Sequence, residues 1–160
     1  MRRAALFLSA AALMVSAVAL SAQTTNFAGK WTMVPDPNAA TGGRGGGGGL
    51  GMEVTIAQDD KTLTTTRTTQ NGDVKSTYNL DGSESTNTMS FGGNSIDQKS
   101  TGKWDGPKFT ITTTRTGQNG PTTSTMALWL DASGNLMIAS TNPPRGGGDP
   151  VTRTFTYKKN

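Results

Sequence analysis

One nine-residue phrase occurs twice in this chain, with a single difference between the two copies. It reads TTTRTTQNG at residues 64–72 and TTTRTGQNG at residues 112–120. Asn-Gly that follows alternating residues is the strongest short-range signal for a β-hairpin, because its turn needs positive φ angles. The repeated phrase therefore predicts a repeated hairpin and constrains the fold to one rich in antiparallel strands.

Placing Asn-Gly at the centre of each turn predicts how the strands beside it pair. In the first hairpin, Leu63, Thr65, Arg67 and Thr69 are expected opposite Leu80, Tyr78, Ser76 and Val74. In the second, Phe109, Ile111, Thr113 and Arg115 are expected opposite Leu130, Leu128, Met126 and Ser124. Side chains alternate between the faces of a strand, so each set shares one face. Both repeats thus place an arginine on the apolar face, opposite a serine.

The remaining sequence is typical of further short strands joined by turns. Strands are predicted over residues 27–34, 52–58, 83–91, 95–104, 136–140 and 151–158, with Met52, Val54 and Ile56 on one face. Trp104 and Phe109 are expected to share the inner face, and no segment has a helical period. A meander of this length either exposes its edges or closes on itself. We predict an all-β fold, a single antiparallel up-and-down β-barrel of about ten strands.

Residues 1–22 have the layout of a secretory signal peptide. Two arginines precede an apolar run and small residues, with plausible cleavage after Ala19, Ser21 or Ala22. The apolar run is short for a membrane span. A lipid anchor is not expected either, because the cleavage site has no cysteine. We expect residues 23–160 to form one domain that is secreted or periplasmic, with no membrane anchor.

Composition argues against several classes of function. The chain has no cysteine and no histidine, which removes the commonest catalytic bases, nucleophiles and metal ligands. Without the two arginines of the leader, 13 basic and 11 acidic residues remain, too small an excess to predict nucleic-acid binding. The acidic residues fall mostly in turns. We expect no enzyme activity, no metal and no cofactor.

Two glycine-rich segments interrupt the strand pattern. They span residues 35–51 and 142–150, and each holds an Arg-Gly-Gly triplet, at Arg44 and Arg145. Such triplets can contact RNA, but single copies with little net charge bind weakly. The favoured interpretation is a pair of flexible loops.

Both ends of the expected domain resemble known families of small barrels. Phe27-x-Gly29-x-Trp31 resembles the first strand of lipocalins and of the related fatty-acid-binding proteins. The last strand, VTRTFTYKK, is similar to the Thr-Arg-x-aromatic ending of the latter family, with Phe155 where a tyrosine is usual. The resemblance implies a lipocalin-like barrel in which Trp31 closes one end. It also implies that Arg153 packs over Trp31, as in lipocalins, or helps hold a ligand carboxylate, as in fatty-acid-binding proteins.

Three arginines fall on the face assigned to the interior: Arg67, Arg115 and Arg153. A buried guanidinium needs a partner, because desolvating an unpaired charge is costly. One hypothesis is that these arginines bind an anionic head group. Their helpers would be Ser76, Tyr78, Ser124 and Tyr157. The structural alternative has Arg153 on Trp31, with the others at the barrel mouth or paired with Glu53 or water.

The expected function is therefore binding without catalysis. We predict a monomeric barrel that holds a small amphipathic or anionic molecule, such as a lipid or fatty acid. The alternative is a structural or surface-assembly protein with a solid-packed barrel and no ligand, since threonine-rich strands also suit pairing edge to edge. A barrel that binds a partner protein through its loops is a third possibility.

Overall fold

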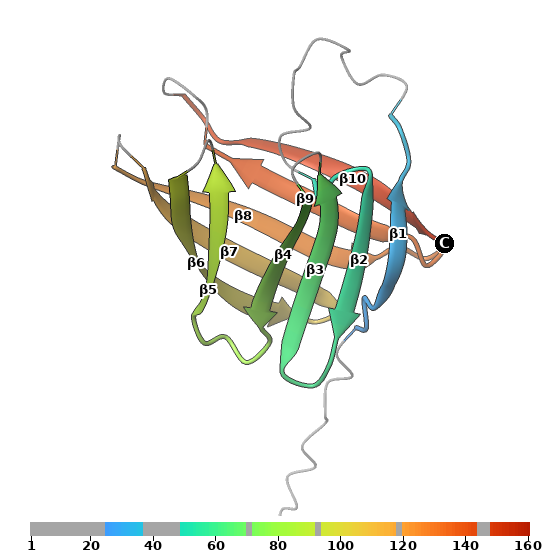
Figure 1. Cartoon of the computed structure of the whole chain (residues 1–160). Coiled ribbons are helices and arrows are strands. Elements are labelled where there is room, and N and C mark those ends of the chain that lie inside the picture. The colour runs from blue at the N-terminus through green and yellow to red at the C-terminus, as the bar shows by residue number, and fades with distance from the viewer. Residues whose placement is uncertain (1–24, 37–48, 70–71, 92–93, 118–119, 144–147) are drawn as a thin grey trace, which may run out of the picture.

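Ten strands form one antiparallel sheet that is nearly closed into a barrel (Figure 1). The computed structural model describes residues 25–36, 49–69, 72–91, 94–117, 120–143 and 148–160. The strands are β1 (Gly29–Met33), β2 (Glu53–Gln58), β3 (Thr62–Thr69), β4 (Gly72–Asn79), β5 (Ser85–Phe91), β6 (Asn94–Asp105), β7 (Lys108–Gly117), β8 (Gly120–Leu130), β9 (Leu136–Asn142) and β10 (Val151–Lys159). The predicted fold class is confirmed, and the predicted strands lie close to the observed ones.

Pairing between the first and last strands brings the sheet almost to closure. The strand order is β4-β3-β2-β1-β10-β9-β8-β7-β6-β5, and Trp31 of β1 lies opposite Lys159 of β10. The two sheet edges, β4 and β5, are therefore consecutive in the chain. Because neighbouring strands alternate in direction, the β3–β4, β7–β8 and β9–β10 connections lie at the same end of the barrel.

An aromatic cluster fills the other end of the barrel, which we call the aromatic end. The rings of Phe27 and Trp104 stack with centroids 5.9 Å apart, and Trp104 lies 4.8 Å from Phe109. Trp104 and Phe109 pair across β6 and β7, as predicted. Gly102 makes room for this packing, because a Cβ atom there would overlap the Phe109 ring. Offset and tilted aromatic pairs are favourable beyond the area that they bury.

Apolar residues at alternate strand positions form the core. In β2 both Val54 and Ile56 are buried, and the residues between them are exposed. The core also contains Trp31, Leu63, Tyr78, Phe109, Ile111, Leu128, Leu136, Ile138 and Tyr157 from other strands, together with Phe27 and Leu50. The period of two in the sequence thus separates an apolar inner face from a threonine-rich outer face.

The predicted hairpin registers are wrong by two residues, in the same way in both repeats. Leu63 pairs with Tyr78 rather than Leu80, and Phe109 pairs with Leu128 rather than Leu130. In consequence, Arg67 lies opposite Val74, Arg115 lies opposite Thr122, and neither arginine faces a serine.

The position of a glycine explains the shift. Gly72 and Gly120 have positive φ angles of 103° and 94°, but each is the first residue of the returning strand, opposite Thr69 and Gly117. The two residues between the strands of each hairpin lie outside the described residues. A shift of two residues keeps every side chain on its face, so the predicted inner and outer faces are retained.

Two other assignments need correction. Met52 precedes β2 and is 56% exposed, so it does not share the buried face of Val54 and Ile56. The strand at residues 151–158 also predicts Val151 on the inner face with Arg153 and Tyr157. Val151 takes that face at the start of β10 but is exposed, because the apolar core does not reach this end of the strand. The predicted signal peptide (1–22), Arg44, Arg145 and most of the glycine-rich segments lie outside the described residues.

Aspartates organise three of the tight turns. Asp59 Oδ1 accepts hydrogen bonds from the backbone N–H groups of Lys61 and Thr62, at 2.8 and 2.7 Å. Asp81 and Asp131 accept equivalent bonds in the β4–β5 and β8–β9 turns. The side chains of Ser83 and Asn135 also donate to Asp81 and Asp131, and these bonds have the largest effect on those two carboxyls. Together the bonds favour the carboxylate form and hold the pKa of all three side chains below the ordinary value.

A side chain bridges the gap in the sheet, where the described residues of β4 and β5 form no ladder. The Thr77 N–H donates to Asn87 Oδ1 at 2.8 Å, and Asn87 Nδ2 donates to the Thr77 carbonyl at 2.9 Å. A side-chain amide offers the same donor and acceptor as a peptide group. Asn87, only 9% exposed, therefore supplies one substitute rung between the edges.

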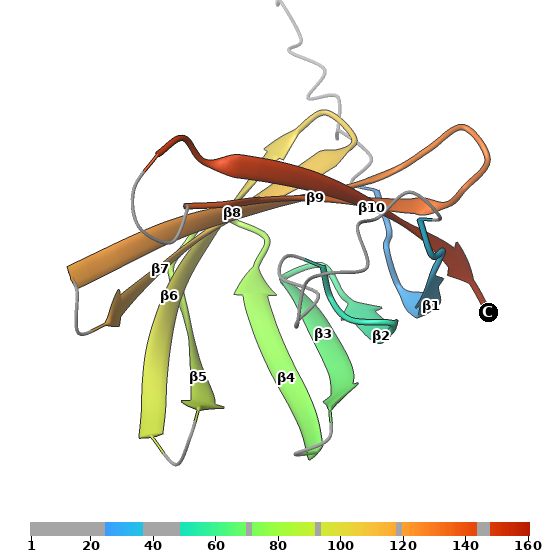
Figure 2. The ribbon, with the colours of Figure 1, turned by 90° about the horizontal axis from the view of Figure 1, so that it is seen from above.

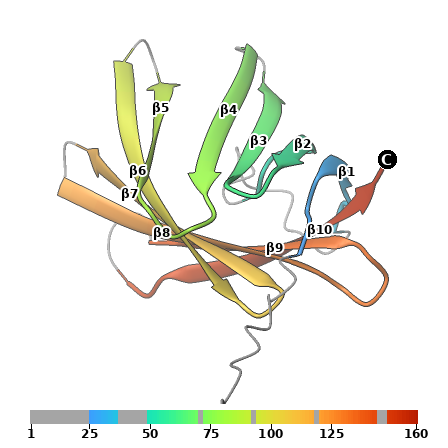
Figure 3. The ribbon, with the colours of Figure 1, turned by 90° about the horizontal axis from the view of Figure 1, so that it is seen from below.

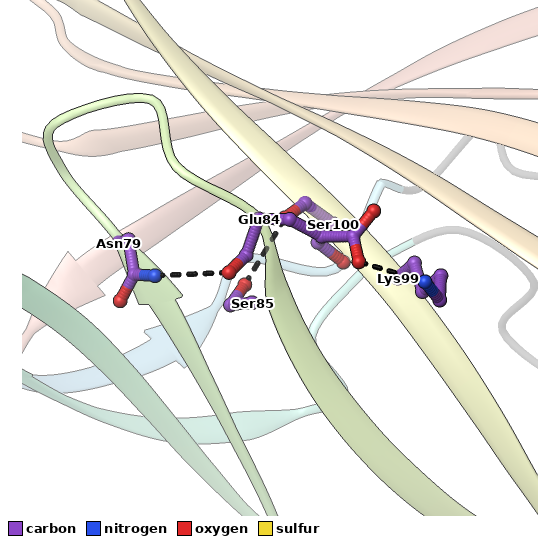
Figure 4. A network of polar contacts seen from close by, with 5 residues as sticks. All are labelled: Asn79, Glu84, Ser85, Lys99 and Ser100. Carbon is purple, nitrogen blue, oxygen red and sulfur yellow. Dashed lines mark hydrogen bonds and ion pairs between the residues drawn. The ribbon is translucent and has the colours of Figure 1, made fainter.

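The β4–β5 turn closes the base of this seam (Figure 4). Asn79 Nδ2 donates to the Glu84 carbonyl, and the Ser85 hydroxyl donates to the Ser100 carbonyl, both at 3.2 Å. Glu84 also pairs with Lys99 at 2.9 Å, an exposed contact that adds little stability. Figures 2 and 3 show the β3–β4 and β5–β6 hairpins diverging on either side of the seam.

Replacing Asn87 by leucine tests the substitute rung. The Asn87→Leu variant keeps the side-chain size but leaves the Thr77 N–H and carbonyl without their partner, so its free energy of unfolding should fall by about 1–3 kcal/mol. Thr86→Ala, an exposed neighbour in β5, is the control and should change by less than about 0.5 kcal/mol. Urea denaturation measures both. Equal stability of Asn87→Leu and the wild type would contradict the role given to this bridge.

Candidate functional site

The candidate site lies on the inner face, toward the end of the barrel that we call the arginine end. Arg67 is near the end of β3, Arg115 near the end of β7 and Arg153 near the start of β10. These positions lie at the same end because they flank the β3–β4, β7–β8 and β9–β10 connections. The strands thus bring the three predicted arginines to one end of the interior, on separate parts of its wall.

Burial distinguishes Arg67 from the other two arginines. Arg67 is half-buried, whereas Arg115 and Arg153 are exposed. Arg115 lies opposite Gln98 and Thr122, and Arg153 lies opposite Ser140. Arg67 alone is placed to act on groups inside the barrel, while the others belong to its rim.

Tyr78 is a buried neighbour of Arg67. Burial raises the pKa of the Tyr78 hydroxyl above its ordinary value. Three influences oppose this rise: a hydrogen bond with Ser76, the positive charge of Arg67 and a hydrogen bond with Thr65. The predicted site residues Arg67, Ser76 and Tyr78 therefore gather around one buried hydroxyl. Thr65, which was predicted on the inner face but not as a site residue, joins them.

Tyr157 lies deeper and is fully buried. Its hydroxyl donates to the Gly51 carbonyl at 2.9 Å and accepts from the Leu50 N–H at 3.0 Å. Burial raises its pKa, while the Leu50 hydrogen bond and the positive charge of Arg67 oppose the rise. Arg67 thus acts electrostatically on both tyrosines of the interior.

Charged residues are divided between the two faces of the sheet. Four acidic residues lie in the strands, and all take outer positions: Glu53, Asp73, Asp97 and Asp105. The charged strand residues at inner positions are all basic: Arg67, Arg115, Arg153 and Lys159. Glu53 cannot be the partner of Arg67, because it points to the opposite face of the sheet. In the described strands, the inner face therefore carries positive charge and no carboxylate.

Small hydroxyl side chains line the inner wall between the apolar core and the arginine end. We call this set the hydroxyl belt: Thr65, Ser76, Ser100, Thr113, Ser124 and Ser140. The predicted residue Ser124 lies opposite Thr113, whose hydroxyl is 2.9 Å from that of Ser100. Hydroxyls can donate to an anion without adding charge. The belt therefore makes the inner surface polar between the apolar core and the arginine end.

The residues of the predicted end motif lie at the aromatic end. Phe27 and Trp31 are buried in the core, and Trp31 Nε1 donates to the Phe27 carbonyl at 2.9 Å. Gly29 packs against the Lys159 side chain, whose Nζ lies 5.5 Å from the Trp31 ring centroid. The proposed packing of Arg153 on Trp31 is wrong, because Lys159 takes that place and Arg153 lies six residues away along β10.

Sequence reasoning missed Leu50 and Asn87. Leu50 is a large apolar residue between two glycines, and this isolated position in a glycine-rich segment could have indicated a buried side chain. Asn87 resembles the other polar residues of β5, so nothing in the sequence distinguishes it.

A hollow lies on the outer face of β1, β2 and β3. Its volume is about 230 Å³, and outer side chains such as Lys30, Glu53, Thr55, Thr66 and Thr68 line it. Small-molecule sites are usually larger and mostly apolar. This polar surface hollow is therefore a weaker candidate than the interior.

The comparisons assign no family. No protein-family profile matches the chain, and no curated protein matches it significantly. Within the described ranges, no three His, Cys, Asp or Glu side chains gather to hold a metal ion, and no helix is long and apolar enough to cross a membrane.

Alkaline titration tests the arrangement around Arg67. Tyr78 and Tyr157 are the only tyrosines of the chain, and both have a raised pKa in the folded state. Burial of the neutral hydroxyls contributes to the free energy of unfolding below pH 10.0, which is the ordinary pKa of tyrosine. This contribution is lost as the pH rises through the raised pKa of the folded state. The folded protein should show little tyrosinate absorbance at pH 10.0. Arg67→Met should delay its onset further, because the positive charge lowers both pKa values.

Lys75→Met, which removes an exposed charge from the outer face, is the control for this titration. It should leave the onset of tyrosinate absorbance where it is in the wild type. Half-ionised tyrosines near pH 10 in the native protein, or an unchanged onset in Arg67→Met, would contradict the arrangement.

Proposed function

We propose that this protein is a secreted or periplasmic, lipocalin-like binding protein. Its barrel takes up a small amphipathic molecule and performs no catalysis on it. The anionic head group of the ligand pairs with Arg67, and the apolar part lies toward the core. The proposal includes the resemblance of the two chain ends to lipocalins and fatty-acid-binding proteins. The nearly closed ten-stranded barrel supports this resemblance at the level of fold.

One observation carries this proposal: the inner face has basic side chains and no acidic one in the described strands. A half-buried arginine on a face whose described strands offer no carboxylate is costly to desolvate, so an anionic ligand would be stabilised there. The hydroxyls of Thr65, Ser76 and Tyr78 add donors beside it. Charge-assisted hydrogen bonds of this kind fix a carboxylate more strongly than neutral ones do.

A solid-packed structural barrel is the second candidate. The observation that favours it is the seam, where β4 and β5 are joined by the Asn87 bridge rather than by a ladder. Unpaired strand edges are templates for pairing with another chain. In this case the protein would assemble as concentration rises and bind no amphiphile.

Calorimetric titration with three ligands of equal chain length separates the two candidates. Dodecanoate, dodecanol and dodecyltrimethylammonium share an apolar tail and differ in the charge of the head. Dodecanoate should bind most tightly, and Arg67→Met should weaken it by roughly 10- to 100-fold, the loss expected for a charge-assisted hydrogen bond.

Lys75→Met is again the control and should bind dodecanoate as the wild type does, because its charge lies on the outer face. Equal binding of all three amphiphiles, or an unchanged affinity of folded Arg67→Met, would rule out the anion site. Failure of every amphiphile to bind, with concentration-dependent assembly, would favour the structural barrel.

A further inference from the structure

Two core residues come from outside the strands, and they are held differently. Among the described members of the core cluster, only Phe27 and Leu50 are not strand residues. Phe27 stacks on Trp104, and its backbone bonds to Gln58 and Trp31. Leu50 is tied to the barrel by the Tyr157 hydroxyl, which bonds to its N–H and to the next carbonyl.

Glycines on both sides of Leu50 allow this insertion. A Cβ atom at Gly49 would lie 2.8 Å from the Tyr157 hydroxyl, closer than such contacts allow. Gly51 has a φ angle of 92°, which other residues adopt at a cost. The segment Gly49–Leu50–Gly51, which we call the plug, is thus shaped to bring Leu50 into the interior, where it is only 7% exposed.

The plug is connected to the proposed head-group site through Tyr157, whose hydroxyl binds Leu50 and Gly51. Its anchor, Tyr157, is under the electrostatic influence of Arg67. A ligand whose head group pairs with Arg67 must place its tail in the same apolar interior. The other core side chains near it belong to strands, whose ladders hold them in place. A β-bridge at Gly49 and two hydrogen bonds to one hydroxyl hold the plug, fewer backbone contacts than a strand has, so it is the part that can yield space at least cost.

We infer that the plug is a built-in competitor of the ligand. Latched by the Tyr157 hydroxyl, it fills the place of the ligand tail and is displaced when an anionic amphiphile binds. This inference rests on the proposed function and adds to it how the interior stays closed in the empty protein.

Thiol labelling follows the plug directly, because the natural chain has no cysteine. Leu50→Cys reports on the plug, and Met52→Cys is the matched control, two residues away and 56% exposed. In the empty protein, Leu50→Cys should react with a soluble disulfide reagent at least about tenfold more slowly than Met52→Cys does, since labelling of the buried position needs local opening. Adding Tyr157→Phe, which removes only the latch hydroxyl, should bring its rate toward the control rate.

Dodecanoate, below its micelle-forming concentration, then tests competition. It should speed the labelling of Leu50→Cys, leave Met52→Cys unchanged and lose its effect when Arg67→Met is added. Circular dichroism and thermal melts show whether each variant is folded.

The outcomes separate the plug from the proposed function. Calorimetric binding of dodecanoate with unchanged labelling of Leu50→Cys would overturn the plug and leave the binding function intact. Labelling of Leu50→Cys at the control rate in the empty protein, or an unchanged rate after Tyr157→Phe, would overturn it as well. No binding of any amphiphile to the wild type would overturn both.

Discussion

Closure of the sheet between β4 and β5 is the constraint on which the rest of the structure depends. A ten-stranded meander buries its inner face only if its two edges meet, and here they meet without a ladder. The Asn87 side-chain amide forms hydrogen bonds with both the N–H and the carbonyl of Thr77. The β4–β5 turn joins the two edges at the base of the seam. Without this closure, Tyr78 on the edge strand β4 and Arg67 on the neighbouring strand β3 would face solvent. Their partial or full burial, and the raised pKa of Tyr78, follow from it.

The two faces of the sheet divide the chemistry between them. Most strand threonines and all of the strand carboxylates face outward, while the inner face passes from an aromatic end through the hydroxyl belt to the arginines. The repeated hairpin explains only part of this pattern. It places Arg67 and Arg115 at equivalent positions, but just Arg67 is half-buried and acts on the two tyrosines. Equivalent sequence positions therefore have different surroundings, because β3 pairs with the edge strand β4, whereas β7 is separated from the edge strand β5 by β6.

Alternation along each strand made the fold and its two faces predictable, since a period of two survives an error in register. The register itself was not predictable, because it depends on whether the glycine of Asn-Gly stands in the turn or begins the returning strand. The sequence pointed to Arg67, Ser76, Tyr78 and Tyr157 as inner residues. It could not show that Tyr157 binds Leu50, because that contact joins residues 107 positions apart. The sequence also could not show that Lys159, rather than Arg153, lies over Trp31, because this contact depends on the register between β1 and β10.

Native mass spectrometry of the protein, purified gently from the cells that make it, tests the central claim most directly. That claim is that the positively charged interior holds an anionic amphiphile. We expect a defined adduct on the wild-type protein, released on unfolding and identified as an acid with an apolar tail, and a much lower occupancy in Arg67→Met. A wild-type protein that carries no adduct, or the same adduct at equal occupancy in folded Arg67→Met, would contradict the claim.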